Sequence, residues 1–269
     1  MAQQGLFADT GRDTGHALPH VRKLHPADLK EALVRGLDDF WAMPSHVVFL
    51  GLIYPVIGFF LARIVLGQDV LPLLFPLVAG FALIGPFAAT GLYELSRRRE
   101  QGLETGWTQA FGVLRSQAFG SVLALGVLLL GVFVCWLYAA QSIYEFTFDD
   151  LGPVSMGGFL RQIMTTPQGW TLFLVGNAVG FLFAVFVLTI SVVSFPLLLD
   201  RHIGIMAAVA TSIRVTMASP LTVALWGLIV AVGLFVGSIP ALLGLAIVMP
   251  VLGHATWHLY RRIVVPLPS

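Results

Sequence analysis

Charged residues are scarce in this sequence, and their scarcity excludes an ordinary soluble domain. Only 11% of the 269 residues are Asp, Glu, Lys or Arg, and 57% are apolar, whereas soluble chains carry about 25% charged residues. Cysteine is almost missing as well: Cys135 stands alone, which excludes an intrachain disulfide and a zinc cluster built on cysteines. A bundle of membrane helices fits this composition, because the 28 glycines let helix backbones approach closely.

Two further absences narrow the function. The first 45 residues contain no apolar segment like the centre of a signal peptide, so we expect the first membrane span itself to start insertion. The sequence also lacks the phosphate-binding loop, the G-x-S-x-G serine motif, the dinucleotide fingerprint and the H-E-x-x-H zinc motif. We therefore predict that the protein is not an enzyme. The basic run Arg97–Arg99 fits an anchor to anionic headgroups, so no nucleic-acid partner is expected.

An amphipathic helix of about four turns is predicted from Pro26 onward, because apolar residues recur there at helical spacing. Its acidic residues, Asp28 and Asp39 among them, are expected on the polar side. Only Lys30 and Arg35 are available to bind anionic lipid, so we expect this helix to pack under the membrane bundle rather than lie on the lipid surface.

Six apolar runs follow, most of them close to the roughly 20 residues that a helix needs to cross a bilayer. The fourth run is long enough that it must tilt, protrude or break near Pro196, and the fifth and sixth are joined by the tight reversal Gly237–Pro240. The sequence therefore predicts an all-α membrane protein with six transmembrane helices. The predicted spans are His46–Leu66, Leu71–Leu95, Phe119–Ala140, Trp170–Leu199, Pro220–Gly237 and Ile239–Leu259.

The positions of the basic residues give the orientation. Of 15 Lys and Arg residues, only Arg63 and Arg161 fall on one side of these six spans, and the other 13 fall on the opposite side. Basic loops stay in the cytoplasm, so both termini are predicted to be cytoplasmic and the protein to be a multi-pass protein of the bacterial inner membrane. The 13 are Arg12, Arg22, Lys23, Lys30, Arg35, Arg97, Arg98, Arg99, Arg115, Arg201, Arg214, Arg261 and Arg262.

Internal similarity suggests three helical-hairpin repeats. The segment Pro250–Arg262 (PVLGHATWHLYRR) resembles Pro86–Arg98 (PFAATGLYELSRR), and SFPLLLDRH around Pro196 is a weaker third copy. Each hairpin is preceded by a predicted cytoplasmic amphipathic helix, the middle one at Trp107–Val122. We predict a flexible cytoplasmic tail at 1–25 and one membrane domain at 26–269, with repeat units at about 26–99, 103–202 and 203–262.

The candidate site residues lie near the predicted cytoplasmic ends of the spans. His254 and His258 are four residues apart on one helical face, a spacing that can present two imidazoles to one metal, and His46 opens span one at similar depth. Glu94 and Asp200 complete a cluster that suits a divalent metal or, through two histidines, a haem. Asn177 in span four is the remaining candidate ligand residue, although such residues usually hydrogen-bond neighbouring helices.

The chain resembles a bacterial family of uncharacterised integral membrane proteins catalogued as domain of unknown function number 2189. The resemblance rests on DLKEALVRGLDDFWAMPSH before span one, GPFAATGLYELSRRRE at the end of span two and SFPLLLDR, and it extends from about residue 28 onward. It implies an integral membrane protein and no known activity.

The sequence therefore favours a non-catalytic accessory or assembly component of a membrane complex. Its partners would be the lipid bilayer and other membrane subunits, with no cofactor. The alternatives are a transporter of a small solute or lipid built from parallel repeats and a membrane protein that binds metal or haem at its cytoplasmic end.

Overall fold

The computed structural model describes residues 19–43, 76, 85–87, 89–148, 156–201, 203–240 and 243–264. This part of the chain is helical, and its only β-type pairing is an isolated antiparallel bridge between Val21 and Val264. The first predicted span, most of the second and residues 1–18 of the predicted tail lie outside the described residues.

Three described helices are long and apolar enough to cross a membrane. They are α6 (Phe119–Thr147), the run from α8 (Pro167–Ser191) into α9 (Ser194–Asp200), and α11 (Pro220–Ser238). They coincide with predicted spans three, four and five. The sixth span corresponds to α12 (Leu245–Ile263), which begins six residues later than the predicted start at Ile239. Six crossings remain a prediction.

The predicted break in the fourth run occurs between α8 and α9, at Val192 and Val193. Pro196 has no N–H to continue the helix, and it lies in the first turn of α9, where that group is not needed. Helix α10 (Ile205–Ala218) covers the break and bonds across it. The Ser212 hydroxyl donates to the Thr189 carbonyl over 2.7 Å, and the Ser194 hydroxyl donates to the Ala208 carbonyl over 3.2 Å.

Two of the three predicted amphipathic helices form as expected: α1 (Pro26–Ala42) and α10. The middle one is wrong as a continuous helix, because α5 (Trp107–Ala110) passes into a 3-10 turn at Phe111–Arg115 and stops before α6. Gly112 lowers helix propensity by about 1 kcal/mol, and the Ser116 hydroxyl bonds the Val113 carbonyl over 2.8 Å, which competes with the next helical turn. The equivalence of three repeat units stays a prediction.

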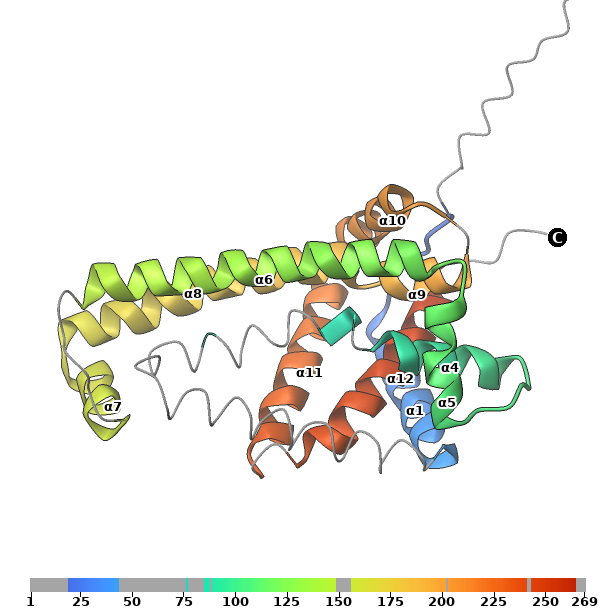
Figure 1. Cartoon of the computed structure of the whole chain (residues 1–269), viewed down its shortest axis with the longest axis horizontal. Coiled ribbons are helices and arrows are strands. Elements are labelled where there is room, and N and C mark those ends of the chain that lie inside the picture. Colours follow the sequence, from blue (N-terminus) through green and yellow to red (C-terminus); the bar gives the residue numbers. More distant parts are fainter. Residues whose placement is uncertain are drawn as a thin grey trace, which may run out of the picture.

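Two helical pairs leave a common end of the molecule (Figure 1). Helices α6 and α8 run side by side, with α7 (Met156–Thr165) at their far end, and α11 and α12 form the second pair. At the common end, α12 packs between α1 and α4 (Thr90–Glu100), and α9 packs on α4 and α12. We call α1, α4 and residues 250–263 of α12 the cap.

Small residues hold the cap together. A Cβ atom on Gly36 of α1 would lie 2.6 Å from the Ala255 nitrogen and 2.7 Å from the Val251 carbonyl oxygen of α12. On the other side of α12, a Cβ on Gly253 would lie 2.5 Å from a methyl group of Leu92 in α4. Backbones that approach this closely need glycine or alanine at the contact, as in the small-residue packing of membrane helices.

One prediction about α1 is wrong in detail, and it matters for the site. Asp28 and Asp39 are 7% and 3% exposed, whereas the apolar Trp41 is 73% exposed. The acidic residues lie on the face that packs against α12, because Asp39 follows Ala32 and Gly36 at helical spacing. The core of the cap therefore contains charge.

Candidate functional site

The carboxylate of Asp39 is the centre of a buried polar cluster in the cap. Its Oδ2 atom accepts a hydrogen bond from the Ser96 hydroxyl of α4 over 2.5 Å and lies 2.8 Å from Nε2 of His258 in α12. Its Oδ1 atom accepts from the guanidinium of Arg99. Nδ1 of His254 lies 2.7 Å from the Ser96 oxygen and 3.9 Å from Oδ2 of Asp39. We call these five residues the Asp39 cluster.

The electrostatics of the cluster keep Asp39 ionised. Burial by itself would raise the pKa of Asp39, but hydrogen bonds from His258 and Ser96, the charge of His258 and the Arg99 bond lower it from 3.8 to about 2. A buried carboxylate with this many donors joins three helices that are distant in the sequence. The cluster therefore stabilises the cap.

The structure brings two of the predicted site residues together and separates others. His254 is fully buried and His258 nearly so, and both meet Asp39. Glu94 is buried but pairs with Arg97 of its own helix at 2.8 and 2.9 Å. Asp200 accepts from the Tyr260 hydroxyl over 2.5 Å. Glu94 and Asp200 therefore bond partners outside the Asp39 cluster.

Asn177 and the metal hypothesis have separate outcomes. The Asn177 amide is exposed on α8 and donates to the Phe173 carbonyl of its own helix over 2.7 Å. Among the described residues, no group of three or more His, Cys, Asp or Glu side chains is arranged to hold a metal ion. His46 lies outside the described residues, so the predicted metal or haem cluster remains a hypothesis.

Sequence reasoning missed Asp39, although a signal was present. The spacing Ala32, Gly36, Asp39 puts the carboxylate on the small-residue face of α1 that a close helix contact requires. An acidic residue on such a face must be paired, because an isolated buried charge is costly. The two histidines of α12 are the partners that the same argument would have named.

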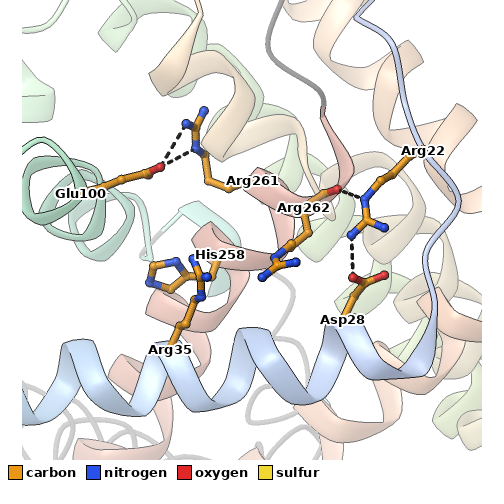
Figure 2. Close-up of a pocket in the computed structure, with 7 residues that line it drawn as sticks. All are labelled: Arg22, Asp28, Arg35, Glu100, His258, Arg261 and Arg262. Carbon is orange, nitrogen blue, oxygen red and sulfur yellow. Dashed lines mark hydrogen bonds and ion pairs between the residues drawn. The ribbon is translucent and has the colours of Figure 1, made fainter.

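A pocket of about 440 Å³ opens beside the cluster, where α1, α12 and the end of α4 meet the segment around Arg22. Figure 2 shows Arg35 from α1, and His258 and Arg262 from α12, directed into the space between these helices. No local sequence pattern indicates this pocket, since it joins segments more than 200 residues apart. Its lining residues are Arg22, Asp28, Arg35, Glu100, His258, Arg261 and Arg262.

Ion pairs connect the pocket walls. Nη2 of Arg22 donates to Oδ1 of Asp28 over 2.5 Å, and Nε of Arg261 donates to Oε1 of Glu100 over 3.0 Å. Burial would raise the pKa of Asp28, but the backbone N–H of His25 and the Arg22 guanidinium lower it below its ordinary value. Asp28 is therefore charged at neutral pH, and both of its oxygens are bonded.

A second open groove, of about 500 Å³, lies between α6 and α8 and is almost entirely apolar. Leu128, Gly131, Cys135, Phe183 and Phe186 are among the residues that line it. Such a groove accepts lipid chains or another apolar helix, and it carries no chemistry of its own.

Comparison with known proteins gives one match. No curated protein and no solved structure matches the chain. Residues 74–200 match a family model described as "Predicted integral membrane protein (DUF2189)". This segment runs from span two through α9 and includes Ser96 and Arg99 of the Asp39 cluster. The resemblance predicted from the sequence is thus confirmed for residues 74–200, which are similar to this family of integral membrane proteins.

Proposed function

We propose that this protein is a non-catalytic accessory or assembly component of a membrane complex. Six spans would hold it in the bacterial inner membrane, with the cap and both termini in the cytoplasm. The bilayer and one or more membrane subunits would be its partners.

The observation that carries the proposal is the α6–α8 hairpin, which extends away from the cap (Figure 1) and exposes large apolar side chains. Phe181 and Phe146 are 67% and 90% exposed, and the groove between the helices contains Gly131. Lipid can cover such a face, but ridges of aromatic side chains beside a glycine groove also suit close packing by another helix. Further exposed residues on the hairpin are Leu123, Val127, Leu130, Val134, Tyr138, Phe173, Leu174, Leu182 and Phe186.

The polar residues of the described spans support a scaffold rather than a carrier. A carrier needs polar groups that turn toward a solute near the bilayer midplane. Here Asn177 and Ser191 bond carbonyl groups of their own helix, over 2.7 and 2.6 Å. Ser194 divides its hydroxyl between α8 and α10. These polar groups therefore bond within a helix or between two helices.

Site-directed cross-linking in native membranes tests the accessory role. A photoreactive residue at Phe181 should form one discrete protein adduct, which also co-purifies in stoichiometric amount with the tagged full-length chain in gentle detergent. The same reagent at Leu221, which is 85% exposed on α11, is the control for a different face. A monomer with only lipid adducts at Phe181 would refute the accessory role.

Reporter fusions test the orientation separately. A reporter inserted in the 101–106 connection after α4 should be active only in the cytoplasm, because Arg97, Arg98 and Arg99 precede it. A periplasmic signal there would overturn the topology and the assignment of the cap to the cytoplasm.

A further inference from the structure

We propose that the arginine-lined pocket of the cap is a phosphate-binding site, in which Arg22, Arg35 and Arg262 hold a phosphate monoester or inorganic phosphate. This goes beyond the accessory role, which requires no ligand, and it stands on different residues. Three features support the site: the fixed positions of the arginines, the local balance of charge and the guanidinium donors that remain for a ligand.

The backbone around Arg22 is fixed against α12. Val21 and Val264 form the isolated bridge, and the Arg22 N–H donates to the Ile263 carbonyl over 3.0 Å. The Leu24 N–H donates to the Ser219 hydroxyl over 2.9 Å. Nε of Arg22 also donates to the Arg262 carbonyl over 2.5 Å, as Figure 2 shows. The side chain of Arg22 is thus held at the pocket before any ligand arrives, which lowers the entropic cost of binding.

Positive charge is in excess on the α1 side of the pocket. Three guanidinium groups, those of Arg22, Arg35 and Arg262, meet two carboxylates there, those of Asp28 and Glu31. Oε1 of Glu31 is shared by Arg262 and Arg35, the latter at 3.0 Å. One formal positive charge is therefore left uncompensated within this group. On the opposite wall Arg261 faces Glu100 and Asp200, at 3.0 and 3.5 Å, and Asp200 also lies 4.0 Å from Arg201, so two cations and two carboxylates balance there.

The groups that remain for a ligand are guanidinium donors, because the Asp28 carboxylate is already bonded. Both oxygens of Asp28 are occupied, by Arg22 and by the His25 N–H, and its side chain is 10% exposed. The side chains of Arg35, Arg22 and Arg262 are 53%, 41% and 33% exposed. Each guanidinium carries five N–H donors, more than its ion pair with Asp28 or Glu31 uses, so donors remain for a ligand.

Phosphate fits this arrangement better than a carboxylate does. A carboxylate would only repeat the role of Glu31, with one charge and two oxygens. A phosphate dianion has oxygens in several directions, and guanidinium groups bind them in pairs with charge-assisted hydrogen bonds. The pocket volume of about 440 Å³ leaves space beyond the phosphate for a small attached group. A lipid with a phosphate monoester headgroup and a soluble phosphate present the same chemistry.

Calorimetry on the purified full-length protein tests the proposal, with inorganic phosphate in one arm and vesicles in the other. The vesicles contain phosphatidylcholine alone or with phosphatidic acid. Saturable binding is expected in at least one arm. Phosphate alone would identify a soluble ligand, and phosphatidic acid alone a lipid. Absence of saturable binding in both arms would overturn the proposal.

Three variants make the test specific. Arg35→Gln should weaken binding by about tenfold, the loss typical of one charge-assisted hydrogen-bonded pair. Arg214→Gln, at an exposed position of α10 outside the pocket, is the matched control and should bind as the parent does. Glu31→Gln should tighten binding several-fold, because it releases Arg35 and Arg262 to the ligand. A gain cannot come from misfolding, so unchanged or weaker binding by Glu31→Gln would contradict the site even if Arg35→Gln unfolds. Equal losses in Arg35→Gln and Arg214→Gln would mean nonspecific charge attraction.

Discussion

The cap and the α6–α8 hairpin belong to one chain but are held together by different forces. In the cap, charged residues such as Asp39 are buried, and Asp39 of α1 is bonded to two other helices, α4 and α12. In the hairpin, the charged residues are at the ends, and large apolar side chains such as Phe181 point outward. Lipid determines the helical structure of the hairpin, since every backbone polar group in lipid must bond within the helix. The cap is shaped by specific side-chain partners.

This difference indicates where substitutions should act. A buried carboxylate with fixed partners and a glycine at a backbone contact have no substitutes, so changes in the cap should be costly. In the hairpin, by contrast, one exposed apolar residue can be replaced by another at little cost. Measured stabilities of matched variants from the two regions test whether substitutions in the cap cost more than those in the hairpin.

The largest effect is expected for Asp39→Ala. The change leaves Ser96, His258 and Arg99 without their shared acceptor, and breaking a buried charged network costs roughly 3–4 kcal/mol. Asp38→Ala, at the exposed neighbouring position, should cost less than about 0.5 kcal/mol. Thermal unfolding of both variants in detergent measures the difference. Equal melting temperatures would show that the cap does not depend on the cluster.

Gly36→Ala should come next, at about 2–3 kcal/mol, because the new methyl group would overlap the backbone of Ala255 and push α1 away from α12. Gly176→Ala is the hairpin counterpart: nothing lies within 4 Å of a Cβ there. Alanine raises helix propensity by up to about 1 kcal/mol, so this variant should be unchanged or more stable. Thermal unfolding again gives the comparison, and a stabilising Gly36→Ala would refute the close contact.

The pH dependence should also separate the regions. Because the folded-state pKa of Asp39 is lowered from 3.8 to about 2, ionised Asp39 favours the folded state fully above pH 3.8, and this contribution is lost as the pH falls through about 2. The shift corresponds to about 2 kcal/mol. Melting curves between pH 5 and pH 2.5 should therefore fall more steeply for the parent than for Asp39→Asn. Parallel curves would contradict the lowered pKa.

The smallest effect is expected for Phe181→Ala on the hairpin. Its side chain is 67% exposed, so the free energy of unfolding should change by less than about 0.5 kcal/mol, while recovery of a membrane partner should fall. Phe195→Ala is the matched change, because Phe195 is fully buried in α9 and its loss should cost about 3 kcal/mol or more. Unchanged partner recovery in Phe181→Ala would move the proposed contact to another face.

Much of the helical layout could be predicted, and the failures have identifiable causes. Long apolar runs predicted α11 and the start of α6 closely, although α6 continues to Thr147, past the predicted end at Ala140. Pro196 marked the break after α8 because proline has no backbone N–H to donate. The middle amphipathic segment failed, since its periodicity suggested one helix while Gly112 and Ser116 favour a tighter turn. The start of α12 was misjudged because apolar residues continue through the turn.

Two of the five residues of the Asp39 cluster were predicted from the sequence. His254 and His258 were found by their spacing on one helix, whereas Asp39, Ser96 and Arg99 had to be brought in from elsewhere. Glu94 and Asp200 were placed with the histidines on the basis of membrane depth. The structure gives each of them its own arginine or tyrosine partner instead.

The sequence by itself determined that this is a helical membrane protein with three or more long apolar helices, because apolar length and charge placement are local properties that the bilayer reads directly. Only the tertiary structure decided that Asp39 would be buried against His258 and that Arg22 would close a pocket with Arg262. The physical reason is the contact of α1 with α12: a glycine-sized gap sets which side chains meet, and no single helix contains that information.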